Sequence, residues 1–142
     1  MEGIRQKIVG LGLSGITREV GFVSGSEKAA VFQASDLFAL PSLNENFGIV
    51  LVEAMQTGKP VLISDQVYIH PEIISESAGV LCRPDPNDCT RALMEVLSNR
   101  AEARRMGERA ANLAQARFSP ESATRQLLNV YSEILRPGAI KL

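Results

Sequence analysis

Two glutamates near the start of an expected helix are the residues of this 142-residue sequence that most directly suggest chemistry. Glu45 lies in a polar loop after a short apolar run, and Glu53 follows with seven residues between them. A helix rises about 1.5 Å per residue, so Glu53 lies roughly 7.5 Å along the helix axis beyond Gly48. Carboxylates that far apart can accept hydrogen bonds from different hydroxyls of one elongated ligand. We do not expect them to act as one acid–base pair.

The backbone between the two glutamates adds hydrogen-bond donors. Gly48 has no side chain, so a ligand can approach the backbone closely there. The N–H groups of the first helical turn have no partner within the helix and can donate to sugar hydroxyls or phosphate oxygens. A purely structural explanation has equal weight on residue types alone: Glu45 as a loop acid beside a positive helix end, and Glu53 as a surface residue.

Four short apolar runs, separated by Pro, Gly, Ser and Asp, predict the strands that position this loop. Each run is apolar on both faces, which is typical of strands buried in a parallel sheet. The runs are residues 20–23, 37–40, 61–63 and 79–82.

Helical segments alternate with these runs. The first is 27–35 with Ser26 as its N-cap, and the second is 48–56, which Gly58 ends. A third begins at Pro71. The second carries a helical stripe of apolar residues that predicts a face packed on the sheet: Phe47, Val50, Leu51, Ala54 and Met55. Alternating strands and helices indicate an α/β fold with a parallel sheet, whose ligands lie beyond the carboxyl ends of the strands.

The remainder of the chain is expected to be helical, over 88–98, 101–116 and 120–135, with Ser119 as the N-cap of the last helix. The whole sequence, 1–142, fits a single domain. Within it we expect a helical or irregular lead-in at 1–17, an α/β core at 18–84 and C-terminal helices at 87–136.

The composition is that of an ordinary globular protein, with 45% hydrophobic and 22% charged residues. A net charge of −1 gives no reason to expect nucleic acid as a partner. No apolar run approaches the roughly 20 residues that span a bilayer, and the N-terminus lacks the apolar core of a secretory signal. We therefore expect a cytoplasmic protein, with attachment to the inner face of the membrane as the alternative.

Several single residues could carry chemistry but have plainer explanations. Cys82 and Cys89 lack metal-binding spacing, so we expect two reduced thiols and no metal. His70 is the only histidine; a loop residue near the ligand is favoured over a catalytic base. Asp65 suits a ligand contact and a plain turn equally well. A surface helix face neutralised by glutamates is favoured over a phosphate site for the arginines at 104, 105 and 109.

The segment from Glu45 to Val61, ENFGIVLVEAMQTGKPV, resembles the E-x7-E signature of the family 4 (group 1) retaining glycosyltransferases. That signature is usually worded E-G-F-G-[hydrophobic]-x3-E-A-M-A-x-G-x-P-V. Other family segments are matched in the same order along the chain: Val20-x-Phe22, Ala34-Ser35-Asp36 through Pro41-Ser42, Pro71-Glu72-Ile73-Ile74, Gly79-Val80-Leu81 with Pro84-Asp85, and Phe118-Ser119.

The resemblance implies the C-terminal, donor-binding domain of the GT-B fold, with a Rossmann-like parallel sheet flanked by helices. It implies transfer of a hexosyl group from a UDP-, GDP- or ADP-linked sugar to a saccharide or lipid acceptor. Glu45 then contacts the donor sugar and is the catalytic candidate, while Glu53 binds the ribose hydroxyls. The implied donor-binding residues are Asn46, Phe47, Gly48, Ile49, Val50, Glu53 and, near the base, Ser24. No cofactor or metal is implied, because helix dipoles and basic residues neutralise the diphosphate.

The sequence also departs from the family pattern. Asn46 stands where glycine is usual, and Ser24 stands at the glycine of V-x-F-x-G, with Gly25 one residue later. The G-R-x-x-x-x-K-G segment that clamps the diphosphate has no match, nor does the N-terminal acceptor domain. We therefore expect a chain truncated on its N-terminal side that binds donor weakly and transfers nothing measurable alone. A partner chain or acceptor domain would complete it, and an exposed sheet edge favours a homodimer.

One alternative is a non-catalytic sugar-nucleotide-binding or assembly module that kept the fold without activity. A sugar-nucleotide epimerase or phosphorylase on the same two-domain fold is disfavoured by the E-x7-E wording.

Overall fold

A three-stranded parallel sheet lies at the centre of the computed structural model, which describes residues 2–135. Its strands are β1 (Phe38–Leu40), β2 (Val61–Ser64) and β3 (Gly79–Cys82), arranged in the order β1-β2-β3. Val61 lies opposite Phe38 on one side and opposite Gly79 on the other. Three of the four predicted strands and the α/β fold class are thereby confirmed.

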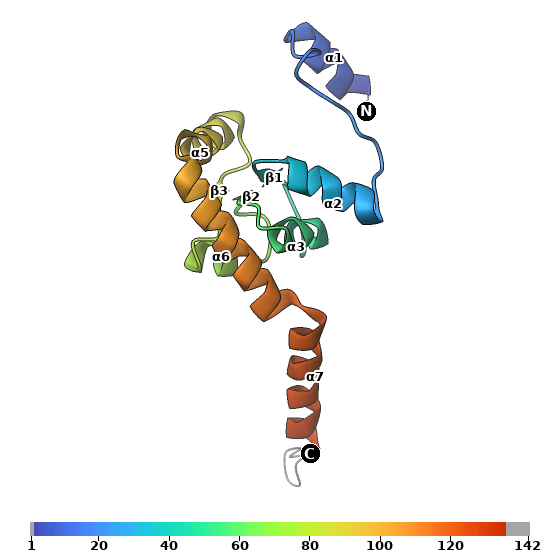
Figure 1. The fold of residues 1–142 in the computed structure, drawn as a ribbon, viewed down its shortest axis with the longest axis vertical. Coiled ribbons are helices and arrows are strands. Elements are labelled where there is room, and N and C mark those ends of the chain that lie inside the picture. The colour runs from blue at the N-terminus through green and yellow to red at the C-terminus, as the bar shows by residue number, and fades with distance from the viewer. Residues whose placement is uncertain (1, 136–142) are drawn as a thin grey trace.

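Helices precede, connect and follow the strands (Figure 1). They are α1 (Glu2–Gly10), α2 (Gly25–Ala34), α3 (Ile49–Gln56), α4 (His70–Ser75), α5 (Pro86–Ser98), α6 (Arg100–Phe118) and α7 (Pro120–Ile134). The Ser119 cap is confirmed, since its side chain accepts a hydrogen bond from the N–H of Ser122. The predicted Ser26 cap is wrong, because Ser24 has the extended backbone of an N-cap and Ser26 lies inside α2.

Two glycines with positive φ set the ends of α3. Gly48 occupies the N-cap position at φ +72°, and Gly58 lies just beyond the C-cap at φ +75°. The N–H of Gly58 donates to the carbonyl of Met55, which satisfies one of the last carbonyls of the helix. The predicted end of this helix at Gly58 is confirmed.

The two faces of the sheet bury separate apolar clusters, because strand side chains alternate between faces. Val61 and Ile63 lie in the larger cluster, with side chains from α3, α4 and α6. Leu62 lies in the other cluster, with Val80 and Cys82 and with α5. The predicted apolar stripe of α3 is confirmed at Leu51, Ala54 and Met55, which are fully buried.

The first predicted strand, 20–23, is wrong: these residues form an irregular, exposed segment. Val20 is 51% exposed and Phe22 94% exposed. Gly21 has φ +66°, a left-handed backbone conformation that lies outside the β region and so interrupts a strand. Figure 1 shows α1 lying away from the sheet, so the chain before this segment brings no cover for its apolar side chains.

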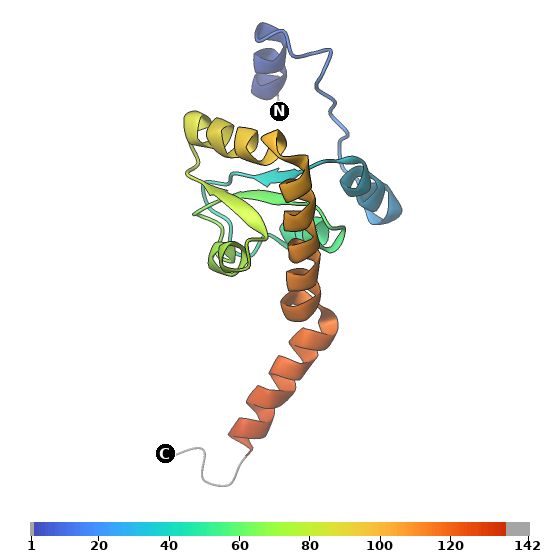
Figure 2. The same ribbon diagram turned by 60° about the vertical axis from the view of Figure 1, so that its left-hand side comes forward.

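The last helix, α7, is confirmed as a helix but carries its apolar face in the open. Figures 1 and 2 show it projecting from the end of α6, away from the sheet. Its apolar side chains are half exposed or more: Leu127, Leu128, Val130, Tyr131 and Ile134. Helical spacing therefore predicted α7 correctly. Within residues 2–135, however, no other element covers its apolar face.

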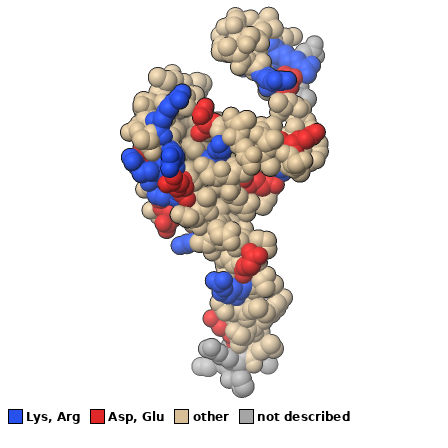
Figure 3. Space-filling model, in the orientation of Figure 1, with Lys and Arg blue, Asp and Glu red and all other residues tan. Residues whose placement is uncertain are grey.

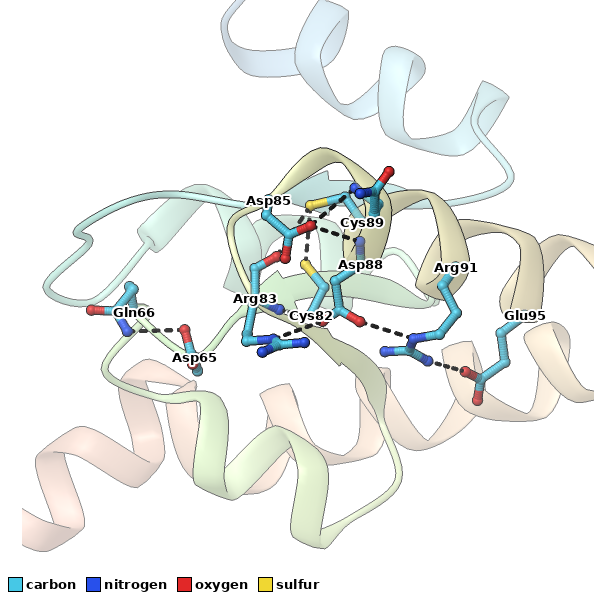
Figure 4. A network of polar contacts seen from close by, with 10 residues as sticks. Asp65, Gln66, Cys82, Arg83, Asp85, Asp88, Cys89, Arg91 and Glu95 are labelled. Atoms are coloured by element: carbon cyan, nitrogen blue, oxygen red, sulfur yellow. Dashed lines mark hydrogen bonds and ion pairs between the residues drawn. The ribbon is translucent and has the colours of Figure 1, made fainter.

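A polar network joins the end of β3 to the start of α5 (Figure 4). Asp85 caps α5 by accepting hydrogen bonds from the N–H groups of Asn87 and Asp88. The Asp88 carboxylate accepts from the Arg83 N–H at 2.7 Å and from Arg91 at 2.9 Å. Cys82 and Cys89 are free thiols whose Sγ atoms lie 3.4 Å apart. Burial, and secondarily the Cys89 thiol, raises the pKa of Cys82 to about 12.

Candidate functional site

The Glu45 loop is tied to the loop that follows β2. Glu45 and Val67 form an isolated parallel bridge, in which the Glu45 N–H donates to the Gln66 carbonyl at 3.1 Å. The N–H of Tyr68 donates in turn to the Glu45 carbonyl at 3.1 Å. Both loops follow the carboxyl ends of neighbouring parallel strands, so Glu45 stands at the edge of the sheet where α/β folds bind ligands.

The Glu45 carboxylate is held at the start of α3. Its Oε1 accepts the N–H of Gly48 at 3.1 Å, and the residue is half-buried. A Cβ at position 48 would lie 3.4 Å from both the Glu45 Cγ and the Leu40 Cδ2 atoms. Glycine is therefore favoured at position 48 by the left-handed backbone conformation rather than by a lack of space for a side chain. The Ile49 and Val50 N–H groups, at the start of the helix, have no partner within it.

An open hollow of about 430 Å³ lies beside Glu45, and we call it the Glu45 hollow. Its polar or charged lining residues are Asn44, Glu45, Asn46, Asp65, Gln66, Tyr68 and His70. Tyr68 is 77% exposed, so its ring is available to a ligand. The His70 Nδ1 lies 2.8 Å from the Val67 carbonyl, to which it donates, so Nε2 remains for a ligand. Asp65 and His70 thus stand near Glu45, as a ligand contact requires.

Glu53 lies on a different side of α3, in a second hollow. Its Oε1 accepts a hydrogen bond from the Lys28 Nζ of α2 at 2.6 Å. Both side chains are about one-third exposed, at 33% for Glu53 and 32% for Lys28. This Glu53 hollow, of about 270 Å³, is lined by Gly25, Lys28, Ala29, Phe32, Glu53, Gln56 and Thr57.

Of the other predicted site residues, only Asn46 lines one of these hollows. Asn46 lines the Glu45 hollow, and Ser24 precedes Gly25 of the Glu53 hollow. Phe47 stacks edge-on against Phe118 with ring centroids 5.6 Å apart, which anchors the loop to the end of α6. Ile49 is 65% exposed and Val50 is half-buried. The structure thus brings Glu45 and Asn46 together in one hollow and places Glu53 in the other, with Phe47, Gly48, Ile49 and Val50 at the start of α3 and outside both.

Sequence reasoning missed Lys28. It lies 25 residues before Glu53, and no local spacing pairs residues on two different helices. The signal available was a lone lysine on a short helix whose other residues facing α3 are small or apolar.

The arginines of α6 form ion pairs along the helix surface, as the sequence predicted. Arg104 contacts Glu108 at 3.1 Å, while Glu102 contacts Arg105 at 2.8 Å and Arg109 at 2.6 Å. Hydrogen bonds from Arg109 and then Arg105 lower the pKa of Glu102. Figure 3 shows the blue and red side chains lying together on this flank. This surface is a neutralised helix face.

Among the described residues, 2–135, there is neither a metal-binding cluster nor a helix that could span a membrane. No group of three or more His, Cys, Asp and Glu side chains is placed to hold a metal ion. None of the helices there combines the length and the apolar character needed to cross a membrane.

Comparisons with known proteins assign the fold and the family. The family model for glycosyl transferases group 1 matches residues 3–113. The D-inositol 3-phosphate glycosyltransferase of Corynebacterium kroppenstedtii is 34% identical over 129 residues, which are 90% of this chain and 28% of that protein.

Two solved structures are similar in three dimensions. Sucrose-phosphate synthase from Thermosynechococcus elongatus has a TM-score of 0.84 at 28% identity, over 95% of this chain and 34% of that one. Anabaena HepE, in complex with UDP and glucose, has a TM-score of 0.82 at 25% identity, over 92% of this chain and 36% of that one. The chain thus spans 28 to 36% of these three proteins. It has the fold of one part of the GT-B glycosyltransferases, and it belongs to the group 1 family of glycosyl transferases.

Proposed function

We propose that this chain is the donor-binding part of a retaining glycosyltransferase, which moves a hexosyl group from a nucleotide-diphosphate sugar to a saccharide or lipid acceptor. One observation carries the proposal: Glu45 precedes α3 and Glu53 lies on it, the two line separate hollows, and Glu45 lies beyond the carboxyl ends of β1 and β2. An elongated ligand with two sets of hydroxyls fits that arrangement. The similar HepE structure contains UDP and glucose, which supports a nucleotide sugar as the donor.

The surroundings of the residues support the roles that we propose for them. Glu45, held by the Gly48 N–H, offers its second oxygen to a hydroxyl of the donor sugar and is the catalytic candidate. The free N–H groups at the start of α3 can donate to the diphosphate, and the helix dipole favours negative charge there. Glu53 accepts hydrogen bonds from the ribose hydroxyls. This assignment needs neither a metal nor a cofactor to hold the donor.

The acceptor is expected to come to the site on another part of the protein. The relatives are about three to four times as long as the matched region, so an N-terminal acceptor domain or a partner chain is part of the proposal. We expect the isolated chain to bind donor weakly and to transfer nothing measurable. Steady product formation by the purified chain would contradict that expectation. Exposed apolar surface favours a homodimer, and a monomeric mass in light scattering would count against one.

Calorimetric titration against UDP-, GDP- and ADP-sugars tests the proposal. We expect binding of at least one of them, weakened about tenfold or more by Glu53→Gln and by Glu45→Gln, because each loses an acceptor for charge-assisted hydrogen bonds. Glu108→Gln is the matched control, since Glu108 pairs with Arg104 on the outer face of α6. Binding that both site variants leave unchanged would contradict the site.

The alternative, a non-catalytic binding or assembly module, makes a different prediction for the longer protein. If the protein that contains this chain binds the donor but transfers no sugar to any saccharide or lipid acceptor, the binding module is correct. If no donor binds, the proposed donor-binding function is wrong and the assembly module is left.

A further inference from the structure

The ion pair between Lys28 and Glu53 is the contact of the Glu53 hollow that the proposed function does not use. The Nζ–Oε1 distance of 2.6 Å is short for a charge-assisted hydrogen bond. The two residues come from different helices, α2 and α3. Both are about two-thirds covered, and both line the hollow. The pair therefore lies at the wall of a cavity that a ligand can enter.

Lys28 is held in place by the docking of α2. Phe32, one helical turn after Lys28, is 7% exposed and packs edge-on against Phe38 of β1, with ring centroids 5.6 Å apart. Residues four apart share one face of a helix, so this anchor turns Lys28 towards α3. Lys59 ties the end of the same helix down, by donating to the Gln33 carbonyl at 2.8 Å.

The hydrogen bond engages only one oxygen of the Glu53 carboxylate. Oε1 accepts from Lys28, and among residues 2–135 no side chain donates to Oε2. A carboxylate fixed through one oxygen presents the other in a defined direction.

We infer that Lys28 is a positioning residue for the nucleotide donor: it holds the Glu53 carboxylate so that Oε2 meets a ribose hydroxyl. The inference rests on the proposed function and adds a specificity-determining residue to it. Lys28 acts through Glu53, so its contribution to nucleotide affinity requires both the Glu53 carboxylate and the ribose hydroxyls. A lysine that contacted the base or the phosphates directly would contribute to affinity even when the carboxylate or the hydroxyls are removed.

NMR titration of the full 142-residue chain measures this, because chemical shifts report affinities down to the millimolar range. The probes are UDP, GDP and ADP, followed by the 2′,3′-dideoxy analogue of the tightest one. We expect Lys28→Met to weaken the ribonucleotide about tenfold and Lys28→Arg to weaken it less than about threefold. In a Glu53→Gln background, Lys28→Met should change nothing further, and it should leave the dideoxy analogue unaffected.

The control is Lys7→Met, which removes a lysine of α1 that does not line the Glu53 hollow. We expect nucleotide affinity unchanged in that variant. Retained amide spectra in each variant show that the fold is intact.

Three results would overturn the inference. Lys28→Met could weaken the dideoxy analogue as much as the ribonucleotide, which makes Lys28 a direct contact. It could strengthen binding, which makes Lys28 a competitor for Glu53. It could have no effect while Glu53→Gln weakens binding. That result would exclude a role of Lys28 in nucleotide binding and would leave the proposed function unaffected. Failure of all three nucleotides to bind the wild-type chain would contradict both the inference on Lys28 and the proposed function.

Discussion

The sheet region and the two ends of the chain carry the same kind of apolar pattern with opposite outcomes. In the sheet region, Leu51 on α3 and Ile63 on β2 are fully buried. At the ends, Phe22 and Leu128 are 94% and 61% exposed. The helical spacing of α7 therefore predicts that helix correctly, whereas strand formation at 20–23 and burial at both ends depend on whether other elements are present to cover the apolar side chains. We therefore expect the sheet region to determine the free energy of unfolding. The exposed ends should instead determine contacts with other chain segments.

The largest expected difference between the regions comes from removing a leucine side chain. Leu51→Ala leaves a cavity in the main cluster and should lower the free energy of unfolding by about 3–5 kcal/mol. Leu128→Ala on α7 should change it by less than about 0.5 kcal/mol, because the side chain is already solvated. Urea denaturation measures both. Equal losses would mean that α7 belongs to the cooperative core.

A smaller effect is expected from adding a methyl group where α6 crosses the end of α3. A Cβ at Gly107 would clash with the Gly58 carbonyl oxygen, so the helix must shift. Gly107→Ala should therefore cost about 2–3 kcal/mol of unfolding free energy. At Gly3 on α1 a Cβ would meet nothing within 4 Å, which makes Gly3→Ala the matched control. A neutral Gly107→Ala variant would contradict this helix contact.

The smallest expected effect is the acid sensitivity of exposed ion pairs. A backbone hydrogen bond from Arg83, then Arg91, lowers the pKa of Asp88 below its unfolded value. Its stabilisation is therefore present above the unfolded pKa and is lost as the pH falls through the folded pKa, below about pH 4. Asp88→Asn should flatten the fall in stability between pH 5 and pH 2 in urea titrations.

Glu19, near the N-terminal end of the chain, is the acidic residue with which the acid sensitivity of Asp88 is compared. Its pKa is also lowered, mainly by a hydrogen bond from Arg5, but this pair joins α1 to an exposed segment outside the apolar clusters. Glu19→Gln should leave the acid dependence of global unfolding unchanged. If Glu19→Gln has the larger effect, the division of the chain into these two regions is wrong.

The sequence allowed much of the central fold to be predicted. The runs at 37–40, 61–63 and 79–82 are apolar on both faces, and each has helices to bury it. The run at 20–23 has the same character, but it lacks cover and contains Gly21 in a left-handed conformation. A strand is a cooperative property of several segments, which one segment's composition cannot reveal.

The candidate site was predictable to a similar degree. The Glu45 loop could be located because a strand end and a helix start are local signals. The Lys28–Glu53 pair could not, because it depends on how α2 docks against α3 through Phe32. Which serine caps α2 was also unpredictable, since Ser24 and Ser26 both precede helix-forming residues.

Mapping the amide shifts of the labelled chain during titration with UDP-glucose tests the central claim most directly. The account predicts that the largest shifts fall around α3 and the two hollows, at Gly48, Glu53, Lys28 and Tyr68, with α1 and α7 unchanged. Shifts confined to α1 and α7, or no shifts at millimolar UDP-, GDP- and ADP-sugars, would contradict it.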